Sequence, residues 1–185
     1  DTWTRIASLP VAFEAPSAGF VLDWQRIDAI RNRGASFATL THAAGISSTG
    51  DPALDRRLPF DEPYRIPPHT AAAIGRAKAA GRRVVAIGTT VVRALEAAAE
   101  PGGTIRAGDG IASNRIGPGT RLRAVDALLT GMHQPGESHF ELLRAFADDA
   151  ALDRISASLT KDGYRGHEFG DSMLRGRDLA RQAPT

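Results

Sequence analysis

The chain contains no cysteine, and only two of its 185 residues are lysine. Without cysteine, disulfide bonds, thiolate nucleophiles and cysteine-ligated zinc are excluded. No apolar run approaches the roughly 20 residues that a membrane-spanning helix needs, and no signal-peptide pattern opens the chain. We therefore expect a cytoplasmic protein with no membrane association. Because the chain starts at Asp1 rather than at methionine, we also expect it to be part of a longer protein.

Several catalytic and cofactor-binding patterns are also missing. No serine lies in the Gly-x-Ser-x-Gly pattern of serine hydrolases. The Gly-x-Gly-x-x-Gly and Gly-Lys-Ser/Thr loops that bind nucleotides do not occur. His133, His139, His167 and Asp171 do not follow a known metal-ligand spacing. We therefore expect neither a metal nor a bound cofactor.

The composition is that of a soluble globular domain, with 42% apolar and 24% charged residues and a formal net charge of +2. Of the 23 basic residues, 21 are arginine. The planar guanidinium binds phosphate in a bidentate manner, so paired arginines along the chain are consistent with a nucleic-acid partner. The alternative is that arginine simply replaces lysine on solvated faces, where 21 acidic residues balance it.

Strand and helix patterns alternate along the chain. Helices are predicted at residues 22–33, 68–80, 89–96, 138–150 and 152–161, and strands at 36–40, 84–87 and 121–130. Residues 53–67 look irregular, and 101–118 resemble a loop with at most a short hairpin. This alternation predicts one α/β domain over residues 1–185, with a largely parallel sheet flanked by helices.

One strand-to-helix junction has the features of an anion-binding site. Residues 84–87 form a short apolar run, and Gly88 permits a sharp turn. Thr89 or Thr90 can then cap a helix, whose first N–H groups and positive dipole end attract an anion. The alternative is an ordinary turn of an α/β domain.

Histidines lie in loops that follow predicted strands or precede helices. His42 and His133 each lie close after a predicted strand, and His167 and Glu168 lie between predicted helices. The unperturbed pKa of histidine, about 6.5, suits proton transfer near neutral pH. A structural role is the alternative for each of them.

These motifs together resemble one family, the S-adenosylmethionine:tRNA ribosyltransferase-isomerases of queuosine biosynthesis. The resemblance runs in order over roughly residues 11–175. It includes Ala-Pro-Ser-Ala-Gly at 15–19, the loop 42–45, Pro-Pro-His-Thr-Ala at 67–71, Gly-Thr-Thr-x-x-Arg-Ala-Leu-Glu at 88–96, Asp-x-Leu-Leu-Thr-x-x-His-x-Pro at 126–135, Gly-Tyr-Arg at 163–165 and Gly-Asp-x-Met-Leu at 170–174.

The resemblance implies a C-terminal α/β portion that lacks the N-terminal β-barrel portion of the family. It also implies an unusual transfer reaction. The ribosyl part of S-adenosylmethionine moves to the aminomethyl group of a deazaguanine base in tRNA, with release of adenine and methionine. S-adenosylmethionine is then a substrate rather than a cofactor, and tRNA is the partner.

For this chemistry we expect His133 to transfer protons, with His42 as its partner or substitute. Thr89, Thr90 and Arg93 would bind a carboxylate or phosphate. His167 and Glu168 are further candidates for substrate binding. Asp171 would bind a ribose hydroxyl or orient a histidine, although capping a following helix is an alternative role.

Two positions near His133 depart from the family pattern. Glu137 stands where typical members have a lysine, and His139 stands where they have threonine. These departures leave two alternatives open. The first is an enzyme of the same fold that acts on another nucleoside acceptor. The second is a non-catalytic fragment that binds tRNA.

Overall fold

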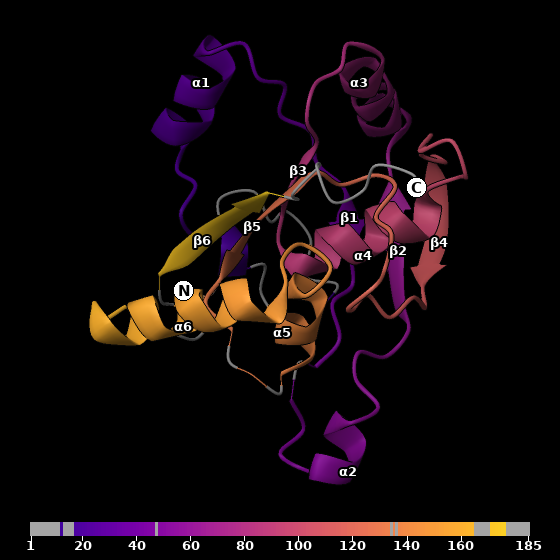
Figure 1. Cartoon of the computed structure of the whole chain (residues 1–185). Helices are drawn as coiled ribbons and strands as arrows, with labels where there is room; N and C mark the ends of the chain where they lie inside the picture. Colours follow the sequence, from indigo (N-terminus) through magenta and orange to yellow (C-terminus); the bar gives the residue numbers. More distant parts are fainter. Residues whose placement is uncertain are drawn as a thin grey trace, which may run out of the picture.

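The computed structural model describes residue 12 and residues 17–46, 48–133, 135, 137–164 and 171–176. Within these ranges, two three-stranded sheets lie on either side of helix α4 (Thr89–Ala98), as Figure 1 shows. The first sheet has the order β1-β2-β4, with strands Thr41–His42, Glu62–Ile66 and Gly108–Ala112. The second has the order β3-β5-β6, with strands Val85–Ile87, Ala127–Gly131 and Ser172–Gly176.

The sheets are mostly antiparallel, so the prediction of a largely parallel sheet is wrong. Both pairings of the first sheet are antiparallel, as is the pairing of β5 with β6. Only β3 and β5 run parallel among the described strands. The α/β class itself is confirmed. The error arose because β2 and β4 were interpreted as irregular segments, and these two strands pair with each other.

Strand β2 was not predicted because Pro63 lies within it and interrupts the residue pattern of a strand. Proline has no N–H and is rare inside a sheet. Here β1 pairs only with Tyr64 and Arg65, so Pro63 lies past its end, where it accepts a hydrogen bond from Ala43. Glu62, Tyr64 and Ile66 are buried, which gives the alternation of a strand with one face in the core.

The helices follow their predicted positions more closely. Helix α1 (Trp24–Asn32) begins after Asp23, whose carboxylate accepts the N–H of Arg26 at 2.7 Å. Helix α3 (Pro68–Ala79) has proline at its first position, where the missing N–H costs nothing. The predicted strand at 36–40 is not formed, and only Thr41–His42 pairs there. A short helix α2 (Pro52–Asp55) and β4 occupy segments predicted as irregular or loop.

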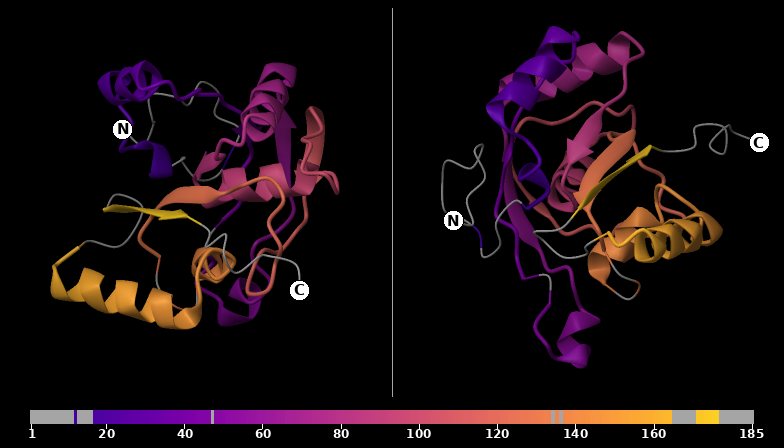
Figure 2. Two further views of the ribbon diagram at one scale, coloured as in Figure 1. Left: turned by 45° about the horizontal axis from the view of Figure 1, so that its top comes forward. Right: turned by 90° about the vertical axis from the view of Figure 1, so that its left-hand side faces the viewer.

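The C-terminal helices divide differently from the prediction. Helix α5 (Ser138–Leu143) is short, and α6 (Asp149–Lys161) begins earlier than predicted because the Asp148 side chain caps it. Glu137 is the N-cap residue of α5, and no side chain caps this helix. All views place α1 and α3 at one end of the molecule and α5 and α6 at the other (Figures 1 and 2).

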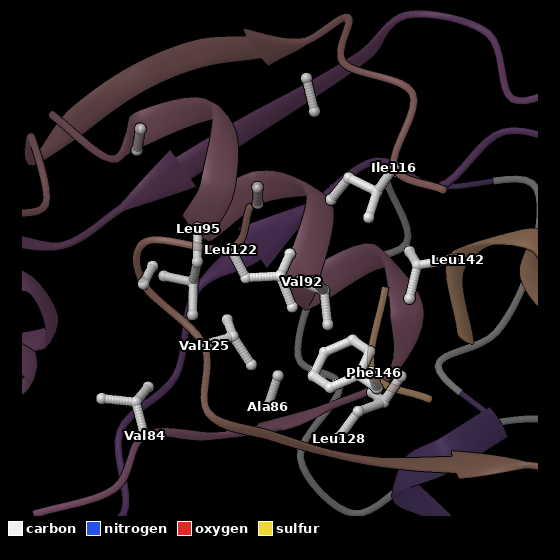
Figure 3. Close-up of a cluster of buried hydrophobic side chains, with 14 of the residues drawn as sticks. Val84, Ala86, Val92, Leu95, Ile116, Leu122, Val125, Leu128, Leu142 and Phe146 are labelled. Atoms are coloured by element: carbon white, nitrogen blue, oxygen red, sulfur yellow. The ribbon is translucent and has the colours of Figure 1, made fainter. Parts of the chain in front are cut away.

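The hydrophobic core surrounds α4. Figure 3 shows Val92 and Leu95 of this helix among side chains that include Ala86 and Leu128 of the second sheet and Leu142 of α5. Val92 and Leu128 are completely buried, and Phe146 packs into the same cluster. The start of α4 is therefore held firmly relative to β3 and β5. No helix within the described ranges is both long enough and apolar enough to cross a membrane.

Candidate active site

The first part of the candidate site is the start of α4. Gly88 is its N-cap residue, with φ of +98°, a value that favours glycine. The Gly88 N–H donates to the Leu129 carbonyl at 2.8 Å, which fixes the turn against β5. The prediction that Thr89 or Thr90 caps the helix is wrong, because no side chain makes that bond. The first N–H groups of a helix have no partner within the helix, so this turn keeps the character of an anion site.

The first predicted motif lies against this turn. Residues Ser17–Gly19 form a 3-10 helix, η1, that contacts β5. The methyl group of Ala18 lies against the turn, since a Cβ atom added at Gly88 would be 3.7 Å from it. Segments that are far apart in the sequence therefore meet at the ends of the parallel strands β3 and β5. Binding loops of α/β folds lie at such strand ends.

His133 follows the end of β5 and is held by its neighbours. Its Nε2 lies 2.8 Å from the hydroxyl oxygen of Thr130, a residue that is 2% exposed. The ring of His139 meets it edge-on, with ring centres 4.9 Å apart. Glu137 Oε2 lies 3.7 Å from Nδ1. Burial, helped by His139, lowers the pKa of His133 to about 4, so the imidazole is neutral at pH 7.

His42 belongs to a second cluster, which is buried between β1, β2 and α4. Its Nε2 lies 3.4 Å from Oε2 of Glu62, and both side chains are less than a tenth exposed. Oε2 of Glu62 also forms an ion pair with Arg93, and Oε1 of Glu62 accepts the N–H of Gly45 at 2.7 Å. Burial and the Arg93 charge lower the pKa of His42 to about 4. Because Arg93 already neutralises Glu62, the nearby carboxylate does not keep His42 protonated.

Arg93 makes contacts that the sequence did not reveal. Besides Glu62, its guanidinium donates to the carbonyl oxygens of Phe60 and Ala112, each at 2.8 Å, and to that of Asn114 at 3.3 Å. The residue is 3% exposed. Its donors thus face the protein interior in this structure. Direct contact with a substrate anion stays a prediction, and the geometry favours a role in positioning Glu62 and the loop that contains Gly45.

The structure brings the predicted residues together only in part. Thr89, 5% exposed, and Arg93 lie one turn apart on the same face of α4, so this helix links the His42 cluster to the anion site. Asp171 is exposed directly before β6. Its alternative role as a helix cap is wrong, because a strand follows it. His167 and Glu168 lie outside the described residues.

Sequence analysis missed Glu62 and Thr130 as site residues. The alternation of residues 62–66 was the signal for Glu62, since a glutamate on the buried face of a strand requires a partner. Two acidic residues of the predicted motifs have structural contacts. Glu96 accepts the N–H groups of residues 123–125 at 2.8 to 2.9 Å, and Asp126 accepts that of Val84 at 2.8 Å. Among the described residues, no group of three or more histidine, aspartate or glutamate side chains lies close enough together to hold a metal ion.

Comparison with known proteins agrees with this architecture. A family model described as "Queuosine biosynthesis protein" matches residues 4–174. The S-adenosylmethionine:tRNA ribosyltransferase-isomerase of Sorangium cellulosum is 41% identical over 182 residues, which cover 95% of this chain and 48% of that protein. The enzyme of the same name from Thermus thermophilus is 37% identical over 175 residues, 92% of this chain and 50% of that protein.

A solved structure supports the same assignment. The crystal structure of S-adenosylmethionine tRNA ribosyltransferase from Thermotoga maritima superposes with a TM-score of 0.68 at 28% identity. The match covers 85% of this chain and 50% of that one. The fold is thus a mixed α/β fold that matches half of the Thermotoga maritima protein. The chain belongs to the queuosine biosynthesis protein family, and it spans about half the length of the curated relatives that it matches.

Proposed function

We propose that this chain is a portion of a cytoplasmic S-adenosylmethionine:tRNA ribosyltransferase-isomerase. In the proposed reaction, the ribosyl part of S-adenosylmethionine moves to a 7-aminomethyl-7-deazaguanine base in tRNA and forms epoxyqueuosine. Adenine and methionine are released. The observation that carries the proposal is the 41% identity to an enzyme of that name over 95% of this chain.

His133 is the proposed base. The reaction needs a group that removes the acidic proton beside the sulfonium, and a neutral imidazole can accept that proton. With its pKa lowered to about 4 by burial, His133 is in this form at neutral pH. If Nε2–H donates to Thr130, the lone pair of Nδ1 is available to accept the proton. Thr130 then fixes the orientation of the ring.

The start of α4 is the proposed anion site. A phosphate of the tRNA backbone, or the methionine carboxylate, would accept hydrogen bonds from the first N–H groups near Thr89 and Thr90. We assign Arg93 to positioning, because its ion pair with Glu62 and its carbonyl contacts tie α4 to β2. His42 would support proton transfer from the neighbouring cluster. Asp171, His167 and Glu168 are proposed to bind the ribose or the acceptor base.

The experiment that tests this function measures adenine release from S-adenosylmethionine by chromatography. The chain is assayed alone and as a chimera in which it replaces the matching half of the Sorangium cellulosum relative. We expect the chimera to release adenine only when tRNA carrying the aminomethyl-deazaguanine base is present. A His133→Ala variant that still folds should lose this activity. No release from a folded chimera under any condition would overturn the proposed transfer reaction.

One observation favours a second candidate function. Glu137 and His139 both lie close to His133, where typical relatives are expected to carry lysine and threonine. An altered charge beside the proposed base suits a different acceptor, such as another nucleoside. Adenine release that depends on a free nucleoside rather than on the modified tRNA would support this alternative. If the chimera binds tRNA in a salt-sensitive manner but releases no adenine, a non-catalytic binding role is favoured instead.

A further inference from the structure

A groove of about 550 Å³ runs between α6 and β6 at the end of the molecule opposite α1 and α3. Figures 1 and 2 show β6 lying alongside α6. Ile155 and Leu159 of the helix, together with Met132 and Met173, give the groove an apolar lining. This volume is typical of sites that enclose a small organic ligand.

One end of the groove lies next to the segment that carries His133. Ser172 lines it and pairs with Gly131, two residues before His133. Met132 also lines it and directly precedes His133. A ligand lying in this groove can therefore place one of its ends beside the proposed base.

Two arginines line the groove away from that end. Arg175 pairs with Leu128, three residues along β6 from Ser172, or about 10 Å at about 3.3 Å per residue. Arg154 projects from α6 into the same groove. Among the described residues, the buried Nε of Arg175 has no hydrogen-bond partner. Because this nitrogen is shielded from solvent, a ligand in the groove would instead contact the terminal nitrogens of the Arg175 and Arg154 guanidinium groups.

We propose that this groove binds S-adenosylmethionine, with its carboxylate on Arg175 and Arg154 and the methylene groups of its methionyl chain against the two methionines. The inference rests on the proposed function and deepens it by locating one substrate. The arginines supply bidentate donors for the carboxylate, and the apolar lining accommodates the methylene chain. The span from Arg175 to Ser172 then brings the ribose close to His133. The start of α4 remains for a phosphate of the tRNA.

The test is calorimetric titration of the 185-residue chain with S-adenosylmethionine and with decarboxylated S-adenosylmethionine, which lacks the carboxylate. We expect Arg175→Gln and Arg154→Gln each to weaken binding of S-adenosylmethionine by about 10- to 100-fold, the effect of losing a hydrogen bond to a charged group. The decarboxylated ligand should bind the wild type similarly weakly, and neither substitution should weaken it further. Arg76→Gln, on exposed α3 at the far end, is the matched control and should bind normally.

The other outcomes are distinct. If both groove variants fold, as judged by thermal unfolding, and bind S-adenosylmethionine like the wild type, the groove proposal is overturned while the proposed function is unaffected. The groove is equally excluded if the wild type binds no S-adenosylmethionine, or if the variants lose only tRNA binding. Arginine-dependent binding without adenine release from the chimera would support the groove and contradict the proposed reaction.

Discussion

The ion pair between Arg93 and Glu62 gives the sharpest prediction about stability. Arg93 is 3% exposed and Glu62 is 6% exposed, so neither charge is solvated by water. Replacement of Arg93 by methionine keeps much of the side-chain volume but leaves the Glu62 carboxylate buried without its cation. It also removes donors from the carbonyl oxygens of Phe60 and Ala112.

The expected loss is large because the pair is buried. Removing one partner of a buried, hydrogen-bonded ion pair costs about 3 to 5 kcal/mol. A domain of this size is stable by about 5 to 15 kcal/mol, so Arg93→Met should remove a large share of the free energy of unfolding. The midpoint of thermal unfolding should fall by about 6 to 20 °C, given about 2 to 4 °C for each kcal/mol in chains of this length.

Urea unfolding followed by circular dichroism measures this loss. The matched control is Arg65→Met, because Arg65 also projects from β2 and pairs with Asp109 at 2.6 Å, but both side chains are 69% exposed. We expect a much smaller effect there, since solvent screens an exposed pair. The double variant Glu62→Gln with Arg93→Met should recover part of the loss, because no buried charge remains and the amide oxygen of the introduced glutamine can still accept the Gly45 N–H. Equal losses for the Arg93 and Arg65 variants would refute the reasoning.

Three further predictions concern the turn, the histidines and the core. Gly88→Ala should lower the free energy of unfolding by about 1 to 3 kcal/mol, because Gly88 has a φ of +98°. Gly75 lies inside α3 with open space around it, so Gly75→Ala should raise the free energy of unfolding by up to about 1 kcal/mol. Urea unfolding measures both changes. In the folded chain His42 and His133 have a pKa of about 4, whereas in the unfolded chain their pKa is about 6.5. The unfolded state therefore binds more protons between these values, and the free energy of unfolding should fall as the pH drops from about 6.5 to 4, by on the order of 3 kcal/mol for each histidine. Glutamine at either position should flatten that decline in a pH series of unfolding curves, and an unchanged slope would contradict the assigned burial. Leu128→Ala should cost about 2 to 5 kcal/mol, because Leu128 is completely buried and the substitution leaves a cavity; a loss below about 1 kcal/mol in the same assay would be inconsistent with its place in the core.

The sequence was most informative where the local signals were strong. The turn at Gly88 and helix α4 were predicted from an apolar run followed by glycine, and both are present. Helices α1 and α3 were predicted from apolar spacing together with glycine and proline signals at their ends. These features depend on the residues themselves and their near neighbours, so a single sequence reveals them.

The sheet pairing could not be predicted in the same way. Strand β4 contains two glycines in five residues, which weakens its intrinsic preference for a strand. It forms because β2 offers a partner, with Gly110 opposite Tyr64, where any side chain would clash with the tyrosine ring. Pairing of distant segments overrides local preference here. The antiparallel sheet that results was therefore outside the reach of local patterns.

The candidate site shows the same division. His133 and the α4 turn were found from their motifs, and the structure adds Thr130 as the contact that orients the His133 ring. Arg93 was expected, from the family resemblance, to bind a substrate anion together with Thr89 and Thr90 at the start of the helix. Its actual partner, Glu62, is 31 residues away in the sequence. A long-range ion pair of this kind leaves no local signal.

The proposed reaction changes one base of the tRNA, and mass spectrometry of the nucleosides detects that change. The chimera is incubated with S-adenosylmethionine and tRNA bearing the aminomethyl-deazaguanine base, and the digested tRNA is analysed. We expect this base to gain the ribosyl-derived epoxycyclopentane group, and we expect His133→Ala to leave it unmodified. Adenine release with an unchanged tRNA base would overturn the proposed transfer, because the chimera would then cleave S-adenosylmethionine without transferring its ribose.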